Sequence, residues 1–382
     1  MDTRLTNICI IGGGIAGLTC AALLRQRHGA EVLVLERASK NGTEDGKSVM
    51  FNASSAAVLA EVGAWPEKNA ALRQIFVSFG NAPGSATIGD GNVPLGYGAS
   101  HHTVLQTLTT SLDNSLCLSA NVKKLTPEND AVRVDYETPE GEKSVKAQAV
   151  VIACAWPGLP TPFQSRVFDY QQAVIALTAK TDNWPPHCAF ENFGKNGIVA
   201  LVPRADANKP VGVIICASEA AAGQLTVLND NAFMQIINDE FGGRFRLHSP
   251  SKRFVYAPQA RHVRPLAAAR IACLGGGASM LHPAGAQGLN IGIADADCLS
   301  SLLAKNSKSS VEDALLNYVR RRSVAHVATL AATSVLAMGG HARFFPFRVA
   351  GGLIASTLSA ASLPWRHQIT RFLSGQKNIT TV

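Results

Sequence analysis

The sequence predicts an α/β fold, in which a βαβ domain assembled from separated segments carries an inserted, mainly antiparallel β-sheet domain and a C-terminal helical tail. Three observations predict it. Residues 7–36 read as a strand, a glycine-rich turn, a helix and a second strand without interruption. Apolar runs at 145–154 and 271–274 have the character of buried strands that return to the same sheet. Between them, 171–217 contains segments typical of antiparallel strands.

The glycines of the first turn have distinct physical roles. Gly12 permits a tight turn, Gly14 lets the backbone approach a pyrophosphate, and Gly17 allows close contact between helix and strand. The helix that follows offers free N–H groups and the positive end of its dipole. Glu36, at the end of the second strand, is placed to accept hydrogen bonds from a ribose 2′-hydroxyl. This Rossmann-like unit predicts an ADP-containing ligand, FAD or NAD(P); a glycine-rich turn of another α/β protein is the alternative.

The remaining elements follow from periodicity and turn signals. Helices are expected at 54–62, 101–112, 231–241 and 288–303, and strands at 72–91, 116–125, 132–136, 145–154, 171–181, 198–203, 211–217 and 271–274. Residues 44–65 are expected to form a loop that enters the first of these helices. The predicted FAD-binding domain comprises residues 1–70, 98–170 and 260–325, the substrate domain 71–97 and 171–259, and the basic, apolar helical tail 326–382.

Composition indicates a compact intracellular enzyme. The chain has 382 residues, 47% of them hydrophobic, which is enough for two domains with large cores. Eight cysteines are scattered without a CxxC pair, so buried free thiols in a reducing compartment are expected. No metal-ligand spacing appears, and no metal is predicted. Because the first strand begins near residue 8, we expect no targeting peptide and a cytoplasmic protein, either free or peripheral on the cytoplasmic face of the inner membrane.

The positive charge is concentrated at the C-terminal end. The net charge is +8, and residues 320–382 carry eight basic residues without an acidic one: Arg320, Arg321, Arg322, Arg343, Arg348, Arg366, Arg371 and Lys377. No nucleic-acid recognition motif accompanies them, so no nucleic-acid partner is predicted. The uncharged stretch 349–365 is too short and polar for a membrane span. An interfacial helix on an anionic membrane, a docking surface for a quinone-biosynthesis complex, or a helical cover of the domain's own core are the alternatives.

The three consecutive arginines of this tail have two interpretations. Arg320–Arg322 follow a predicted helical segment, and we expect them to form its solvated end. A lipid-headgroup site is the alternative.

A second informative stretch is LGGGASMLHPAGAQGLNIGIADAD, residues 274–297. It places His282 and Pro283, and then 287–290, at the start of a helix that follows a strand and glycines. The glycines allow close backbone approach, and a helix start offers unpaired N–H groups to a ring rich in carbonyls. A flavin ring accumulates negative charge at its N1/O2 edge when it is reduced, and such a helix end would stabilise that charge.

With these residues the chain resembles the class A flavoprotein hydroxylases, which have the para-hydroxybenzoate hydroxylase fold, and most closely the ubiquinone-biosynthesis flavin hydroxylases. The resemblance rests on IGGGIAGLTCAALL and VLERA, on GKSVMFNASSAAVLAEVGAWP, and on LHPAGAQGLNIG with Asp295 beyond it. The segment HHTVLQTL also matches the family's helix, in which Gln106 would approach the flavin nucleotide.

The resemblance implies FAD as cofactor, NAD(P)H as a transient reductant, O2, and hydroxylation of a lipophilic aromatic substrate, a polyprenylated phenol of ubiquinone biosynthesis. No obligatory catalytic residue is implied, because the flavin supplies the oxygen chemistry. Pro283 and the backbone of 288–290 should border the ring. His282 lies beside them, either as a structural histidine that bonds a backbone carbonyl or as a proton-transfer group. The predicted cofactor contacts are Gly12, Gly14, Gly17, Glu36, Arg37, Lys47, Gln106, Gly275, Pro283, Gln287, Gly288, Leu289 and Asn290.

The chain departs from the family pattern at three places. The family's Gly-Asp before the His-Pro motif is Gly275-Gly276 here, its mid-chain Asp-Gly is replaced by residues 154–158, and its loop arginine is Lys47. Each lost polar contact predicts weaker retention of FAD. Two other functions are therefore open: a hydroxylase of a soluble aromatic metabolite, and a degenerate, flavin-poor scaffold in a quinone-biosynthesis complex.

Overall fold

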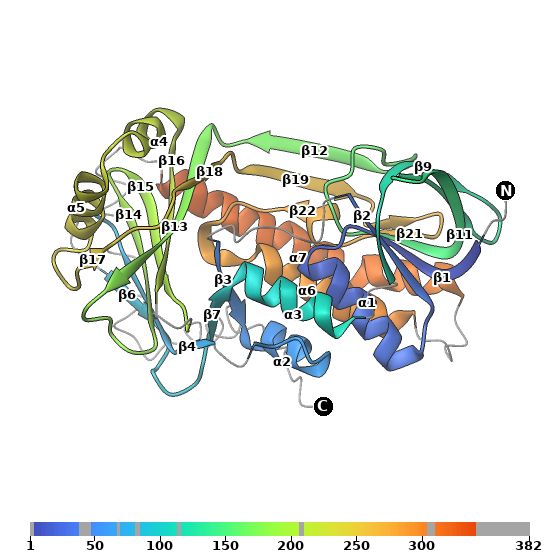
Figure 1. Cartoon of the computed structure of the whole chain (residues 1–382), viewed down its shortest axis with the longest axis horizontal. Helices are drawn as coiled ribbons and strands as arrows, with labels where there is room; N and C mark the ends of the chain where they lie inside the picture. Colours follow the sequence, from blue (N-terminus) through green and yellow to red (C-terminus); the bar gives the residue numbers. More distant parts are fainter. Residues whose placement is uncertain are drawn as a thin grey trace.

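The computed structural model describes residues 4–37, 47–66, 69–80, 85–112, 116–205, 210–303 and 310–340. Figure 1 shows a mostly parallel sheet at one end, an antiparallel sheet with two helices at the other, and a layer of helices between them. This mixed α/β architecture confirms the predicted fold class.

The first sheet collects strands that lie far apart in the sequence. Its order is β20-β21-β11-β1-β2-β8; β10 also pairs with β11, and β9 pairs with β10. The central pairs β11–β1, β1–β2, β2–β8 and β11–β21 are parallel. The strands are β1 (Arg4–Ile11), β2 (Val32–Glu36), β8 (Cys117–Ser119), β9 (Asn121–Pro127), β10 (Val132–Thr138), β11 (Gly141–Ile152), β20 (Ala267–Ala268) and β21 (Ile271–Cys273). The assembly from separated segments is therefore as predicted.

Two helices pack closely on this sheet because small residues line their contact. The helices are α1 (Ile15–His28) and α6 (Gly288–Leu302). A Cβ added at Gly292 would lie 3.0 Å from the Cβ of Ala16 and 3.0 Å from the Cα of Gly275. The close approach of α1 and α6 therefore requires small residues here, and it brings their N-terminal halves together. The shorter helices α2 (Ala53–Glu61) and α3 (His101–Ser111) lie beside them (Figure 1).

The second sheet is mainly antiparallel, with the order β17-β13-β16-β15-β14-β5-β6 and β18 beside β13. Its strands are β5 (Gln74–Ser78), β6 (Ser85–Ile88), β13 (Gln172–Thr181), β14 (Cys188–Gly194), β15 (Gly197–Pro203), β16 (Val211–Ser218), β17 (Leu247–His248) and β18 (Phe254–Tyr256). Helices α4 (Glu219–Thr226) and α5 (Asp230–Glu240) cover one face over an apolar core that includes Phe190, Phe233 and Phe245. The other face points toward the first domain.

Several strands were not expected from the sequence. Residues 48–52, predicted as part of a loop, form β3 (Ser48–Asn52), which pairs with β7 (Gly96–Ser100) beside β4 (Ala70–Leu72). Strand β14 escaped prediction because Glu191 and Asn192 interrupt its apolar run. A further three-stranded sheet joins β12 (Gln164–Asp169), β19 (Gln259–Arg264) and β22 (Ser279–Met280).

The eight cysteines are all free, and five of them are buried, as the composition predicted. Among the described helices, none combines the length and the apolar character needed to cross a membrane.

The C-terminal helix differs from the prediction. Helix α7 runs without interruption over Val311–Gly340, so the expectation that the three arginines form the solvated end of a helix is wrong. They lie in its middle, and Arg322 is directed inward, where its Nε donates to the Asp295 carboxylate at 2.7 Å. The tail predicted from residue 326 begins inside this helix, and 341–382 lie outside the described residues. The other predicted boundaries remain our proposal.

Asp295, which is fully buried on α6, is the centre of a polar network between α6, α7 and β22. Besides Arg322, it accepts hydrogen bonds from His326 Nε2 at 2.9 Å and from the backbone N–H of Gly275 at 3.1 Å. The Ser279 hydroxyl donates to His326 Nδ1 at 2.8 Å. The same hydroxyl oxygen lies 2.8 Å from His262 Nδ1. Burial raises the pKa of Asp295, but the hydrogen bonds from His326 and Arg322 and the Arg322 charge keep it below its usual range.

The buried ion pair predicts a large difference between two neighbouring arginines. Arg322→Ala leaves the Asp295 charge buried with one partner fewer, which should cost about 3–5 kcal/mol of unfolding free energy. Arg321→Ala, at an exposed position of the same helix, should change it by about 0.5 kcal/mol or less. Urea denaturation of both variants measures the difference; equal losses would contradict this account.

His262 predicts a pH dependence of stability. Burial, His326 and Arg264 lower its pKa from 6.5 to about 4, so the unfolded chain takes up a proton at a higher pH than the folded chain. The contribution of neutral His262 is therefore complete above pH 6.5 and is lost as the pH falls toward 4. Urea titrations across this window should show a weaker loss for His262→Asn than for the wild type. His187→Asn, at an exposed histidine, should follow the wild type.

Candidate active site

The first turn leaves space for a ligand at the start of α1. A Cβ at Gly17 would collide with the Gly12 carbonyl oxygen, whereas a Cβ at Gly14 would meet nothing within 4 Å. Gly14 is also the N-cap, and no side chain caps the helix. The Glu36 carboxylate accepts the backbone N–H of Gly13 at 2.5 Å, so it lies directly beside this turn. The open helix start next to a carboxylate suits the phosphates and ribose of an ADP group. Arg37 follows as an exposed residue.

The second open helix start belongs to α6. Pro283 precedes a short 3₁₀ turn, η3 (Ala284–Ala286), after which Gln287 caps α6 through its backbone alone. We call residues 282–287 the His-Pro loop. Gly288 is exposed, and a Cβ there would meet nothing within 4 Å; Leu289 is half-buried. The Gln287 amide donates to the Gly285 carbonyl at 3.0 Å and so stabilises the loop.

Asn290 fastens the His-Pro loop to β3. Its side chain accepts the N–H of Asn52 at 2.9 Å and donates to the carbonyls of Met50 at 3.1 Å and Ala286 at 2.9 Å. The residue is buried, so its side chain serves the scaffold while its backbone forms the first turn of α6. Contacts with a flavin ring would therefore come from the backbone N–H groups of this turn and not from the Asn290 side chain.

His282 is completely buried, and both of its ring nitrogens have partners. Nδ1 accepts the backbone N–H of Ala284 at 3.1 Å, so Nε2 carries the proton and donates to the Gln172 side-chain oxygen at 2.7 Å. The Tyr170 ring packs edge-on against it at 4.8 Å. His282 therefore connects the His-Pro loop to the second domain, and its partner is a side-chain carbonyl rather than the backbone carbonyl that the sequence suggested.

Two other predicted contacts lie at the edge of this region. Gln106 is exposed on α3. The Lys47 ammonium is 5.6 Å from the centre of the Tyr256 ring of the second domain, and its carbonyl accepts the N–H of His101. Their contacts with a cofactor remain predictions.

Gly276 marks the position where the chain lacks the family's aspartate. A Cβ there has only the Ala153 carbonyl oxygen nearby, at 3.6 Å, so the structure has room for a side chain. The neighbouring Gly275, with φ +50°, is held by the Asp295 carboxylate. Asp295 thus stabilises the loop backbone, but its carboxylate is bonded to Gly275, Arg322 and His326. It therefore does not replace the aspartate side chain that is missing at Gly276.

Trp156 and Trp184 lie away from this region. Trp156 donates its indole N–H to the Val122 carbonyl at 3.3 Å and packs on the core of the first domain. Trp184 packs against Phe190 and Phe245 behind the second sheet. Each of them therefore packs within its own domain, and Trp365 lies outside the described residues.

A strip of partly accessible side chains crosses the inner face of the second sheet. Strand pairing places Glu191 beside Val77 on one side and Ala200 on the other, with Ile214 next in the row. All four keep part of their surface accessible, whereas Phe190, Val199 and Val213 on the opposite face are buried. We call this partly accessible strip, together with the side of the His-Pro loop that faces it, the recess.

Glu191 is the site residue that the sequence did not reveal. Its carboxylate accepts a hydrogen bond from the backbone N–H of Gly285, and burial raises its pKa from 4.5 to about 7. The available signal was a single acid at an inward position of an otherwise apolar strand. The recess is otherwise apolar, because Met50, Val202 and Phe193 pack around the same face.

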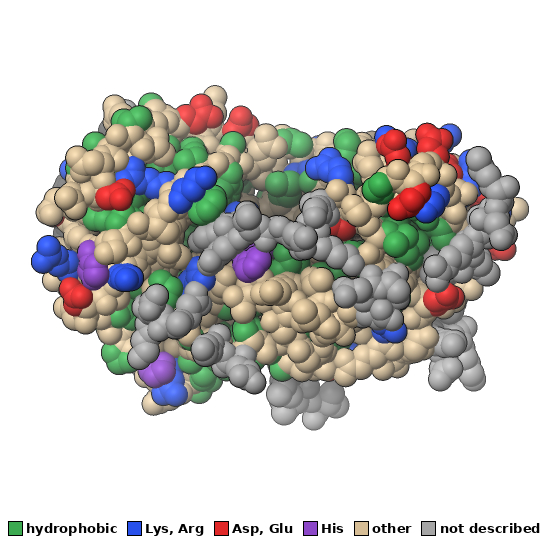
Figure 2. All heavy atoms as spheres, viewed as in Figure 1, with side chains coloured by type: hydrophobic (Ala, Val, Ile, Leu, Met, Phe, Trp, Pro, Cys, Tyr) green, Lys and Arg blue, Asp and Glu red, His purple; other side chains and the backbone are tan. Residues whose placement is uncertain are grey.

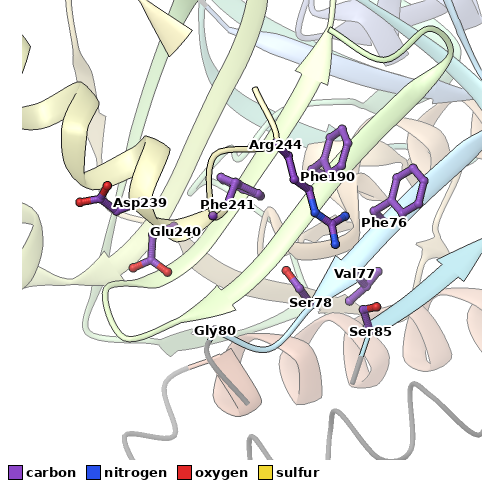
Figure 3. A pocket seen from close by; sticks show the side chains of 11 residues that line it. Phe76, Val77, Ser78, Gly80, Ser85, Phe190, Asp239, Glu240, Phe241 and Arg244 are labelled. Atoms are coloured by element: carbon purple, nitrogen blue, oxygen red, sulfur yellow. The ribbon is translucent and has the colours of Figure 1, made fainter. Parts of the chain in front are cut away.

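A separate pocket of about 240 Å³ lies on the opposite face of the sheet. Phe76 and Phe190 stack at its wall, 5.1 Å apart, and Figure 3 shows Arg244 and Glu240 on different sides of it. Because Phe190 and Glu191 are consecutive in a strand, they point to opposite faces. Phe190 therefore lines this pocket, whereas Glu191 faces the recess.

Together, these features fit FAD. The open start of α1 with Glu36 suits the ADP half, the open start of α6 suits the flavin ring, and the contact of Ala16 with Gly292 makes the two ends neighbours. In Figure 2, Lys and Arg side chains lie among Asp and Glu at both ends of the molecule, so the described part of this face shows no broad basic patch.

Comparisons with known proteins agree with this geometry. The family described as "FAD binding domain" matches residues 5–333. Ubiquinone hydroxylase UbiL of Rhodospirillum rubrum is 24% identical over 355 residues, which cover 87% of this chain and 81% of that protein. The 3-demethoxyubiquinol 3-hydroxylase of Escherichia coli is 23% identical over 327 residues, covering 81% of this chain and 82% of that protein. The crystal structure of p-nitrophenol 4-monooxygenase from Pseudomonas putida aligns with a TM-score of 0.78 at 17% identity, over 98% of this chain and 100% of that one. The fold is thus that of the FAD-dependent aromatic monooxygenases, with FAD as cofactor.

The space at Gly276 predicts a gain of cofactor affinity. Gly276→Asp would supply a carboxylate for a hydrogen bond to FAD, which is worth about 1–3 kcal/mol, or a roughly 5- to 150-fold lower Kd. Gly276→Ala, which adds only the Cβ, should leave Kd within about threefold of the wild type. Titration by flavin fluorescence measures both; an unchanged Kd in the aspartate variant would show that this position does not face the cofactor.

Proposed function

Because the chain belongs to the FAD-binding domain family, we propose that it is an FAD-dependent aromatic monooxygenase whose substrate is a polyprenylated phenol of ubiquinone biosynthesis. The observation that carries this proposal is the apolar recess that faces the His-Pro loop. Its residues are mostly apolar and suit contact with an aromatic ring and an alkyl chain. The Glu191 carboxyl group can form a hydrogen bond with a substrate hydroxyl. The two ubiquinone hydroxylases among the relatives support the same substrate class.

The residues around the site have distinct tasks in this reaction. Bound FAD supplies the activation of O2, so that one oxygen atom enters the ring and the other leaves as water, with two electrons from NAD(P)H. The N–H groups at the start of α6 stabilise negative charge on the ring. Asn290 and His282 hold the His-Pro loop in place from both domains.

The end of α7 supports entry of a lipophilic substrate. Leu336 reaches to 3.5 Å from the position of a Cβ at Gly285, so this part of the helix borders the His-Pro loop. Val335 and Met338 next to it are exposed, at 65% and 56%. Exposed apolar side chains beside a site favour contact with a lipid surface or with an apolar ligand. Peripheral membrane contact is part of the proposal for this reason.

Gly276 favours one alternative, a flavin-poor scaffold, because the chain lacks the aspartate that would form a hydrogen bond with FAD at this position. The two functions are separated by anaerobic mixing of the FAD-loaded protein with NADH or NADPH. A monooxygenase should lose its flavin absorbance near 450 nm at a rate that a phenol increases; a scaffold should show no such stimulation.

The proposed substrate class predicts a specific defect. A strain without this protein should accumulate a polyprenylated quinone precursor that lacks one hydroxyl group, and the purified holoenzyme should add 16 mass units to that precursor with NAD(P)H and O2. Mass spectrometry of the lipid extract and of the reaction measures both. An unchanged quinone profile together with an unreactive precursor would leave the soluble aromatic metabolite as the substrate class to pursue.

A further inference from the structure

The geometry points to Glu191 as the residue that accepts the proton of the substrate hydroxyl and disfavours aromatic substrates that carry a carboxylate. This inference rests on the proposed function and adds a residue-level basis for substrate choice. Its basis is the juxtaposition of a single carboxylate in an apolar recess with the backbone of the His-Pro loop.

The position of Glu191 is fixed from two sides. Strand β14 lies between β15 and β5, and its backbone pairs with Ala200 and Val77 on either side. The carboxylate also accepts the N–H of Gly285, in the loop whose next residues lead into α6. A substrate ring between the sheet and a flavin at the start of α6 would therefore lie within reach of this carboxylate.

The surroundings of Glu191 offer it few charges. The loop opposite contributes Ala284, Gly285 and Ala286, and the flanking strands contribute Val77 and Ala200, none of which titrates. His282 lies nearby in the loop but is engaged with Gln172. On β16, Cys216 is the titratable group that senses Glu191, since the carboxylate adds to the burial that raises the pKa of this thiol. Among the described residues in contact with the recess, no cation balances the carboxylate.

An acid in such surroundings suits proton transfer from a phenol. The carboxylate takes the phenolic proton, so that Glu191 becomes a neutral acid and the substrate a phenolate; the proton passes to solvent when the product leaves. A phenolate ring is richer in electrons and attacks an electrophilic oxygen faster. A positioned base typically contributes about 10²- to 10⁴-fold in rate, most effectively when its pKa is near the working pH. With burial holding the pKa of Glu191 at about 7, the residue is suited to this task near neutrality.

The same charge selects among substrates. A carboxylate on the substrate would meet the Glu191 carboxylate in an apolar space, where like charges repel strongly. A neutral phenol with an alkyl substituent meets no such penalty. The recess is thus matched to a neutral, apolar phenol and opposed to aromatic acids.

The test compares full-length holoenzymes of the wild type, Glu191→Gln, Glu191→Asp and the exposed control Glu142→Gln. The probes are 4-ethylphenol and 4-hydroxyphenylacetate, which differ by a carboxylate in place of a methyl group. Binding at pH 8 is measured from the change in flavin absorbance, which does not depend on turnover. The wild type and Glu142→Gln should bind the ethyl compound at least tenfold more tightly, and Glu191→Gln should bring the two affinities within about threefold of each other.

Kinetics provide the second readout. For 4-ethylphenol, kcat/KM of the wild type should fall as the pH decreases through about 7, because Glu191 is then protonated. Glu191→Gln should be at least about 100-fold slower without this pH step, and Glu191→Asp should retain the step.

Each outcome decides the inference. An active wild type whose pH step and preference persist in Glu191→Gln would overturn the role of Glu191 and leave the proposed function intact. A wild type that binds FAD but neither binds nor hydroxylates either phenol would overturn both. Equal flavin content in all four proteins excludes misfolding as the cause of a difference.

Discussion

The Asp295 carboxylate is the group on which the geometry of the whole site depends. A buried charge is tolerated only when its partners are in place, and here they come from Arg322 and His326 on α7 and from the backbone of Gly275. The carboxylate therefore fixes the loop before the His-Pro motif and the position of α7 together. Tyr318, one turn before Arg322 on α7, adds a hydrogen bond to the Cys273 carbonyl at 2.8 Å.

Helix α7 carries this constraint to the second domain. Ser334, near the end of α7, forms a hydroxyl–hydroxyl hydrogen bond of 2.8 Å with Tyr170. The carbonyl of Ala337 accepts a hydrogen bond of 3.5 Å from the Gln172 amide. Gln172 also holds His282. The second sheet is thus positioned against the His-Pro loop by the same helix that balances Asp295. In this way a polar network in the core of one domain is connected to the contact between the two domains.

The sequence predicted what depends on local pattern and missed what depends on distant contacts. The βαβ unit was predictable because its glycines and periodicity lie within thirty residues, and Gly12, Gly14 and Gly17 occupy the turn that their spacing suggested. Arg322 was misplaced because its partner lies 27 positions away. One signal was available, since Arg322 and His326 are four residues apart and share a helix face.

Strand β14 shows how one strand serves two layers with different chemistry. Asn192 faces outward, where its amide donates to Glu240 at 2.8 Å and its oxygen accepts from the Ser78 hydroxyl, also at 2.8 Å. Glu191 faces inward. A slip of one residue would exchange them and place a carboxylate among the phenylalanines behind the sheet. The tight turn between Gly194 and Gly197, the latter with φ +112°, prevents this by fixing the pairing of β14 with β15. The backbone conformation of Gly197 thus determines whether Glu191 or Asn192 faces the His-Pro loop.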